Sequence, residues 1–167
     1  MHIISYVLSY DHPLQDRWIP DEEEYNEIVK CDYCNVQDFT KEELLHSFTT
    51  LLRGMFPGNP ELKGSITKNG YCEVVVPKGV IRKYLEAEIG KLKKKVGEIT
   101  PDNYTDVAHY ILDYVDYVDA WDNVFVEISD GGIEDYETGL RSLARSLKDN
   151  DKKATTIYVY GAINHHI

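Results

Sequence analysis

The segment 101–121 constrains the fold of this chain most strongly, because its apolar side chains recur at the spacing of an α-helix. When this segment is drawn as a helix, one face is apolar, and its members are Tyr104, Val107, Ala108, Ile111, Val115 and Val118. Pro101 suits the first helical position, and Thr100 before it can cap the helix. The pattern therefore predicts one amphipathic helix that docks its apolar face on the core.

The opposite face of this predicted helix is acidic and is the candidate partner-binding surface. Its carboxylates and neighbouring tyrosines, with one carboxylate near the border, are Asp102, Asp106, Tyr110, Asp113, Asp116, Tyr117 and Asp119. Successive helical turns lie about 5.4 Å apart, which is comparable with the spacing of phosphates along nucleic acid, about 3.4 Å per strand. Tyrosines beside such a row can anchor an interface. The sequence thus predicts a row of negative charge suited to a basic partner.

The basic residues of the chain are concentrated just before this helix. Residues 53–95 carry ten basic and four acidic side chains, whereas residues 96–140 carry 12 acidic side chains and no basic one. The net charge of −11 attracts cationic partners and repels nucleic acid and membrane surfaces. Two interpretations stay open. Either the basic segment packs against the acidic helix and largely cancels its charge, or the acidic helix faces solvent as a binding surface.

Hydrophobic patterning predicts an α+β fold. Runs of β-branched and aromatic residues indicate four strands, at 2–10, 71–76, 124–128 and 155–163. Helical spacing indicates further helices at 21–29, 40–56, 78–96 and 133–147. We therefore predict a single acidic domain over 1–167, in which a small mixed sheet of about four strands packs with four to five helices.

Several local patterns make this prediction more specific. Asp21 can cap the first of these helices, and Thr40 with Glu43 forms a capping box for the second. The unbroken valine run 74–76 predicts a strand that is buried on both faces. If the residues around Ile66 form a strand, then Asn69-Gly70 closes a hairpin. We expect 31–39 to be a connection and 130–132 to be a turn from strand to helix.

Cys31 and Cys34 form the only motif with metal-ligand spacing. Zinc would need two more ligands, for which His46 and Cys72 are the candidates, and unremarkable thiols are the alternative. Zinc is therefore the one cofactor that the sequence leaves open. Three cysteines are too few for a disulfide framework, and they favour a reducing, cytoplasmic location.

The terminal histidines are a further candidate site. His2 could combine with His165 or His166 in a metal or acid–base site if the two terminal strands pair. Adjacent residues of a strand point to opposite faces, so that His165 and His166 do not easily serve one site. Free terminal histidines are the alternative.

Known catalytic signatures are missing: the chain has no GxSxG, GxGxxG or GxxxxGK[ST] motif. The sequence therefore favours a non-enzymatic binding or inhibitor protein whose acidic surface engages a basic protein, by nucleic-acid mimicry of a nuclease-type target. Antirestriction, anti-CRISPR and toxin-immunity proteins are of this general type, and the similarity lies in charge and size alone. The alternatives are a small metal-dependent hydrolase and a structural subunit of a larger assembly. Direct contact with nucleic acid or a membrane is not expected.

Overall fold

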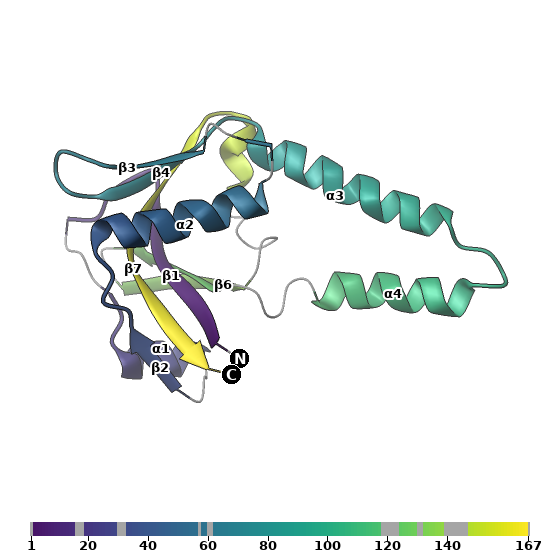
Figure 1. The fold of residues 1–167 in the computed structure, drawn as a ribbon, viewed down its shortest axis with the longest axis horizontal. Coiled ribbons are helices and arrows are strands. Elements are labelled where there is room, and N and C mark those ends of the chain that lie inside the picture. Colours follow the sequence, from purple (N-terminus) through teal and green to yellow (C-terminus); the bar gives the residue numbers. More distant parts are fainter. Residues whose placement is uncertain are drawn as a thin grey trace.

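The computed structural model describes residues 2–15, 19–29, 33–56, 58–59, 62–117, 124–129, 132–138 and 147–166. These residues form a mixed sheet with four α-helices and one short 3-10 helix (Figure 1). In chain order the elements are β1 (His2–Tyr10), α1 (Glu22–Val29), β2 (Tyr33–Val36), α2 (Lys41–Met55), β3 (Lys63–Ile66), β4 (Cys72–Val76), α3 (Val80–Gly97), α4 (Tyr104–Tyr117), β5 (Val124–Ser129), β6 (Gly132–Thr138), η1 (Lys148–Asp151) and β7 (Thr155–His166). The α+β class and the helix count are confirmed, but the described sheet has seven strands rather than about four.

The sheet is organised around the 12-residue strand β7, which forms hydrogen bonds along both of its edges. One edge pairs antiparallel with all of β1. The other edge is shared by β4, which pairs with the first half of β7, and β2, which pairs with its last four residues. Between them, the backbone N–H of Gln37 donates to the carbonyl of Ala162 at 2.8 Å. β5 lies parallel to β1, and the full order is β3-β4-β7-β1-β5-β6, with β2 beside β4 on β7.

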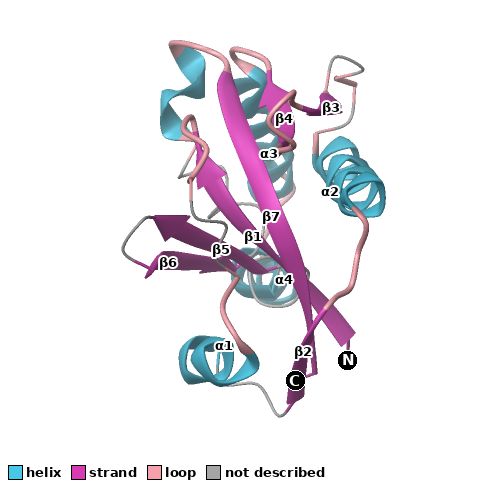
Figure 2. Ribbon diagram, turned by 90° about the vertical axis from the view of Figure 1, so that its left-hand side faces the viewer, coloured by secondary structure: helices cyan, strands magenta, loops and turns pink. Residues whose placement is uncertain are grey.

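Alternate side chains of β1 point into two apolar clusters, one on each face of the sheet. Tyr6 and Leu8 belong to the larger cluster, together with side chains from α2 and the first turn of α3. Val7 belongs to the smaller cluster, with Tyr25 of α1. Figure 2 accordingly shows α1 and α2 on opposite sides of the sheet. The single described parallel pairing, between β1 and β5, confirms that the sheet is mixed.

The first two helices begin where their capping residues predicted. In α2, the backbone N–H of Glu43 donates to Thr40 Oγ1 at 3.2 Å, and the backbone N–H of Thr40 donates to Glu43 Oε2 at 2.9 Å. These bonds complete the capping box, and the hydrogen bond from the Thr40 backbone lowers the pKa of Glu43. Before α1, Asp21 and Glu24 make the same reciprocal pair of bonds, at 2.9 and 3.1 Å.

The predicted helix at 133–147 is wrong over its first six residues, where the chain instead forms β6. β6 pairs antiparallel with β5, and Ser129 stands opposite Gly132. Asp130 and Gly131, between the two strands in sequence, lie outside the described residues. Pairing with β5 overrides a helical periodicity that rested on few residues. Residues 139–146 of that predicted helix lie outside the described residues.

Other strand predictions had mixed outcomes. The conditional hairpin is confirmed, because β3 pairs with β4 and Gly70 takes a positive φ of 77° in the turn. The valine run is buried on one face only, since Val75 is 39% exposed while Val74 and Val76 are buried. β-Branched residues suit any pleated surface, including an exposed one. β2 was missed because it is only four residues long and lies within the expected connection at 31–39.

Helices α3 and α4 form a hairpin, residues 80–117, that projects from the sheet and is called the arm below (Figure 1). Only Val80 and Ile81 of α3 are buried. α4 packs mainly against α3. Over its described residues, the helix predicted at 101–121 therefore packs mainly on α3 rather than on the sheet core, while α2 packs against β3, β4 and β7. In the described part of the chain, no helix has the length and apolar character needed to cross a membrane.

Candidate functional site

The outer end of the arm is shaped by Asn103 rather than by Thr100. Its side-chain Oδ1 accepts a hydrogen bond from the backbone N–H of Thr100 at 2.7 Å, and its Nδ2 donates to the carbonyl of Glu98 at 2.9 Å. The carbonyl of Asn103 then accepts the first helical bond of α4, from Val107 at 3.0 Å. The predicted start at Thr100 and Pro101 is thus wrong, and these residues belong to the turn between the helices.

Two of the predicted partner-binding carboxylates, Asp102 and Asp106, lie exposed at the start of α4. Within the described part of the chain, neither is joined to another side chain by a hydrogen bond or salt bridge. Tyr104, predicted to lie on the apolar face, is 62% exposed, while Val107 and Ala108 after it are half-buried against α3. The turn before α4 and the first turn of α4 therefore present two carboxylates and an aromatic ring to solvent.

The remaining predicted partner-binding residues are less fully described. The backbone of Tyr110, Asp113, Asp116 and Tyr117 belongs to α4, but their side chains lie outside the description. Asp119 lies outside the described residues altogether. The candidate surface as it can be described consists of Asp102, Asp106 and Tyr104, together with the neighbouring His109 on the exposed side of the helix.

The basic residues of α3 make ion pairs close to their own positions in the chain. Lys91 bonds to Glu88 at 2.6 Å, and Lys95 bonds to Glu98 at 3.2 Å. Nearer the sheet, Arg82 bonds to Glu86 at 2.9 Å. The hydrogen bond that Lys91 donates to Glu88 raises the pKa of Lys91, which keeps that ammonium group charged. The basic and acidic helices therefore lie side by side, while these three cations pair with carboxylates of their own segment.

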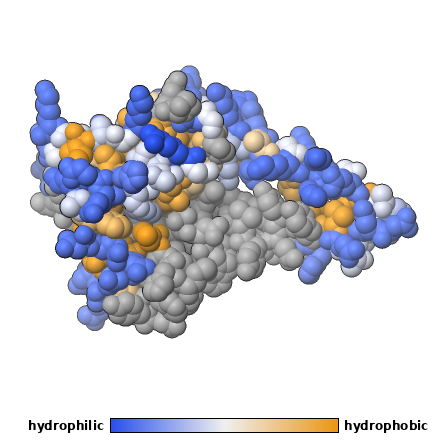
Figure 3. All heavy atoms as spheres, in the orientation of Figure 1, coloured by the Kyte–Doolittle hydropathy of each residue, from blue (hydrophilic) through white to orange (hydrophobic). Residues whose placement is uncertain are grey.

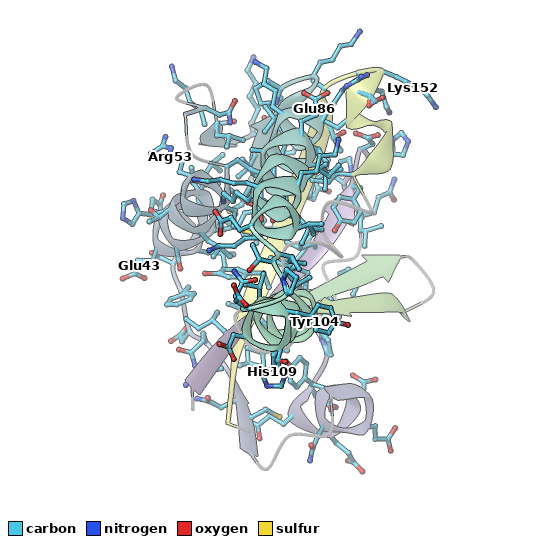
Figure 4. All side chains as sticks on the ribbon, turned by 90° about the vertical axis from the view of Figure 1, so that its right-hand side faces the viewer. Glu43, Arg53, Glu86, Tyr104, His109 and Lys152 are labelled. Carbon is cyan, nitrogen blue, oxygen red and sulfur yellow. The ribbon has the colours of Figure 1, made fainter. Side chains whose placement is uncertain are left out.

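Figure 4 looks along the arm from its outer end. Glu86 lies on the side of α3 that is turned away from α4, and His109 lies on the side of α4 that is turned away from α3. Asp106 is three residues before His109, so it shares that outer side of α4. The Asp106 side chain is therefore directed away from the basic helix.

A second acidic cluster lies on the sheet body, in α1. Glu22, Glu23, Glu24 and Glu27 are all exposed there. Acidic residues in the first turn of a helix are favoured by the partial positive charge of that end. The capping role of Asp21 and Glu24 gives this cluster a structural explanation.

The candidate zinc ligands are not brought together. Cys34 is buried on the α1 face and donates to the carbonyl of Glu22 at 3.3 Å. Cys72 is buried on the α2 face and donates to the carbonyl of Lys41 at 3.6 Å. The two also pair with β7 six residues apart, opposite His165 and Val159, which is about 20 Å along a strand.

As far as the chain is described, the other two candidate ligands do not complete a metal site with Cys34 or Cys72. His46 is exposed on α2, and Cys31 lies outside the described residues. Across the described residues, no group of three or more His, Cys, Asp or Glu side chains is arranged to hold a metal ion.

The terminal strands do pair, as the histidine site required. His2 of β1 stands opposite His166 of β7, and Tyr33 of β2 stands opposite the same residue on the other edge. His165 is offset by one position, beside Cys34, so the two neighbouring histidines belong to different faces. The side chains of His2, His165 and His166 lie outside the description.

Comparisons of this chain with protein-family models, curated proteins and solved structures found no match.

Three residues that shape the arm were missed from the sequence. Asn103 was passed over because a cap was assigned to Thr100, although Asn is itself a favoured cap residue. Asn150 anchors the base of the arm but was assigned to a polar turn. Ile89 lies in the helix predicted at 78–96, and its exposure depends on where α3 leaves the sheet, which no local pattern specifies.

Proposed function

We propose that this protein is a non-enzymatic binding protein, and that the acidic side of α4 engages a basic protein partner. The observation that carries this proposal is the position of Asp102 and Asp106, which are exposed at the outer end of the projecting arm and make no ion pair within the described part of the chain. An exposed, unpaired carboxylate keeps its full charge available to a cationic partner. The neighbouring Tyr104 offers an aromatic side chain of the kind that anchors interfaces.

The shape of the arm indicates which kind of protein it can bind. A projecting helix can enter a groove that a broad sheet surface cannot, and grooves lined with Lys and Arg are typical of enzymes that handle nucleic acid. Asp106 lies in the first turn of α4 and Asp102 in the turn just before it, so that both charges lie near the outer end of the arm. We therefore propose a nuclease-type partner, in which the arm occupies part of the nucleic-acid groove.

The experiment is capture of the partner followed by competition. The protein is immobilised, lysate is passed over it at low salt, and the bound proteins are released with rising sodium chloride. We expect a basic protein that high salt releases, because exposed charges are screened over about 10 Å at 0.1 M salt. Duplex DNA added at constant ionic strength should also release it, since the arm and DNA compete for one groove. A captured partner that DNA leaves in place would contradict nucleic-acid mimicry.

Charge-neutral variants test whether the arm itself carries the binding. Asp102→Asn with Asp106→Asn should weaken binding roughly two- to thirtyfold and reduce its salt dependence. The matched control is Glu23→Gln with Glu27→Gln, which removes the same charge from α1 on the sheet body. The control should bind nearly as well as the unmodified protein. Equal losses in the two variants would mean that net charge alone attracts the partner, and the proposed site would then be wrong.

A further inference from the structure

Apolar residues that remain at least partly exposed follow one side of α3 and continue into the turn after it. They recur at alternating spacings of four and three positions, and they are Leu85, Ile89, Leu92, Val96 and Ile99. Ile89 and Val96 are each 50% exposed, Leu85 is 39% exposed, and the other two are half-buried. Figure 3 shows hydrophobic atoms on the arm, bordered by hydrophilic ones. We call these five residues the α3 stripe.

The α3 stripe follows the heptad repeat of helices that pack against one another. In that repeat Ile89 and Val96 occupy the a positions, and Leu85, Leu92 and Ile99 occupy the d positions. The stripe therefore has the pattern of a seam for one further helix.

α4 occupies a different side of α3 from most of this seam. The more covered positions of the exposed part of α3 are Glu88, with 24% of its side chain exposed, and the half-buried Leu92. Ile89 lies about 100° around the helix from Glu88, on the open side. A helix can thus pack on the α3 stripe while α4 stays in place, as in a four-helix bundle.

The charges beside the stripe identify the partner. The positions that flank a and d carry Glu86 and Glu88 in the first half of α3, and Lys93 and Lys95 in the second half. A copy of α3 that runs antiparallel brings the acidic half of one helix beside the basic half of the other. In the register that aligns Leu85 with Val96 and Ile89 with Leu92, Glu86 lies near Lys93 of the second copy, and Glu88 lies near Lys95 of the second copy.

We infer that the α3 stripe is the contact surface for a second copy of this chain, paired antiparallel arm against arm. Two antiparallel hairpins complete a four-helix bundle, and the acidic side of α4 stays on its outside. This arrangement is independent of the proposed partner-binding function, because it uses α3 rather than Asp102 and Asp106.

The charge on the rest of the chain favours this direction of pairing. The arm holds six basic and seven acidic side chains, a net of −1, so that residues outside it carry −10 of the total of −11. Antiparallel arms place the two sheet bodies at opposite ends of the bundle, which limits their repulsion. A parallel pairing would set the bodies side by side and would keep only the contact from Glu88 to Lys93.

Sedimentation equilibrium over a wide range of protein concentration tests the dimer. The unmodified protein should associate from monomer to dimer, and Ile89→Glu should raise the dissociation constant by roughly a hundredfold or more, because the dimer buries two unpaired charges. The matched control is Ile66→Glu, which introduces the same charge at a similarly exposed isoleucine on β3. Circular dichroism checks that both variants keep their helix content.

If the unmodified protein is a monomer at every concentration, the inference is overturned. It is also overturned if Ile89→Glu and Ile66→Glu raise the dimer dissociation constant equally. The direction of pairing is tested by reversing charges. Glu86→Lys should weaken the dimer roughly tenfold, and Glu86→Lys combined with Lys93→Glu should restore it. In a parallel pairing Glu86 would lie beside Ile81 of the second copy, so that reversing its charge would remove no contact between the two copies. A Glu86→Lys variant that dimerises normally would therefore exclude the antiparallel arrangement.

Discussion

The side-chain Oδ1 of Asn150 accepts a hydrogen bond from the backbone N–H of Ile81 at 3.4 Å, and so caps α3 from 69 residues further along the chain. α3 has no cap of its own, because the residue before it is Gly79, with a φ of 80° and no side chain. The side-chain Nδ2 of Asn150 donates to the carbonyl of Val76 at 3.1 Å, and its backbone carbonyl accepts from the backbone N–H of Gly79 at 3.0 Å. One buried amide therefore joins β4, the base of the arm and η1.

Asn150→Ala should destabilise the protein by about 2 kcal/mol, because it leaves buried backbone groups of Val76 and Ile81 without their partner. For a chain of this size, the melting temperature should fall by roughly 4–8 °C. Asn150→Asp keeps the acceptor for Ile81 but loses the donor to Val76, and it adds a buried charge. Thermal unfolding followed by circular dichroism measures both. A loss of less than about 0.5 kcal/mol in Asn150→Ala would contradict the anchoring role.

The carboxylate of Asp11 links the end of β1 to the start of β7. Burial raises its pKa, but the hydrogen bond with Lys153 and the bond from the backbone N–H of Thr156 outweigh this, so that the pKa is lowered. A carboxyl group with a lowered folded-state pKa stabilises the fold above its unfolded pKa of about 3.9, and this contribution is lost as the pH falls through the folded value.

Asp11→Asn should therefore lower stability at neutral pH while making it less sensitive to acid below about pH 4. Asn tolerates the positive φ of 60° at this position, so that the comparison isolates the charge. Urea unfolding at neutral pH and at about pH 3 measures the difference between the two proteins. If the unmodified protein and the variant lost stability in parallel over that range, Asp11 would have no part in the acid response.

How much of this fold was accessible from sequence depends on the range of the interaction involved. Capping boxes such as Thr40 with Glu43 act within one helical turn, and they were found correctly. The strand β6 depends on pairing with β5, and its few apolar residues fit a helix as well as a strand. The local pattern therefore gave the wrong element where the tertiary pairing was needed.

The candidate site was accessible in part for the same reason. The amphipathic character of α4 follows from its own residues, and the exposure of Asp102 and Asp106 agrees with it. The direction in which the arm leaves the sheet is fixed by Asn150, far along the chain, and it exposes Ile89 instead of burying it. The basic and acidic helices lie side by side, but Lys91 and Lys95 pair with Glu88 and Glu98, and both charge interpretations stay predictions.

A buried hydroxyl pair connects the sheet to α1. Tyr25 and Ser5 are both fully buried, and their side-chain oxygens share a hydrogen bond. Tyr25→Phe should lower the free energy of unfolding by about 1–2 kcal/mol, because it removes the tyrosine hydroxyl and leaves the buried Ser5 hydroxyl without this bond. Ser5→Ala should lower the free energy of unfolding by a similar amount. The double variant should lose clearly less than the sum of the two single losses, because both ends of the bond are removed together. Denaturant unfolding of all four proteins gives this coupling, and strict additivity would argue against it.

Substitution by alanine should change stability in opposite directions at Gly79, the residue before α3, and at Gly90, inside α3. Gly90 lies in the interior of α3, and a Cβ atom added there meets no atom within 4 Å, so Gly90→Ala should stabilise the helix by about 0.5–1 kcal/mol. A Cβ at Gly79 also has room, but its φ of 80° is unfavourable for alanine, and Gly79→Ala should destabilise the base of the arm by about 1–2 kcal/mol.

Hydrogen exchange measures both effects. Amides of α3 should exchange roughly two- to fivefold more slowly in Gly90→Ala, and faster in Gly79→Ala. Because Gly90 lies outside the α3 stripe, its substitution should leave the dimer dissociation constant nearly unchanged. Equal effects of the two substitutions on exchange would contradict the backbone geometry that distinguishes these positions.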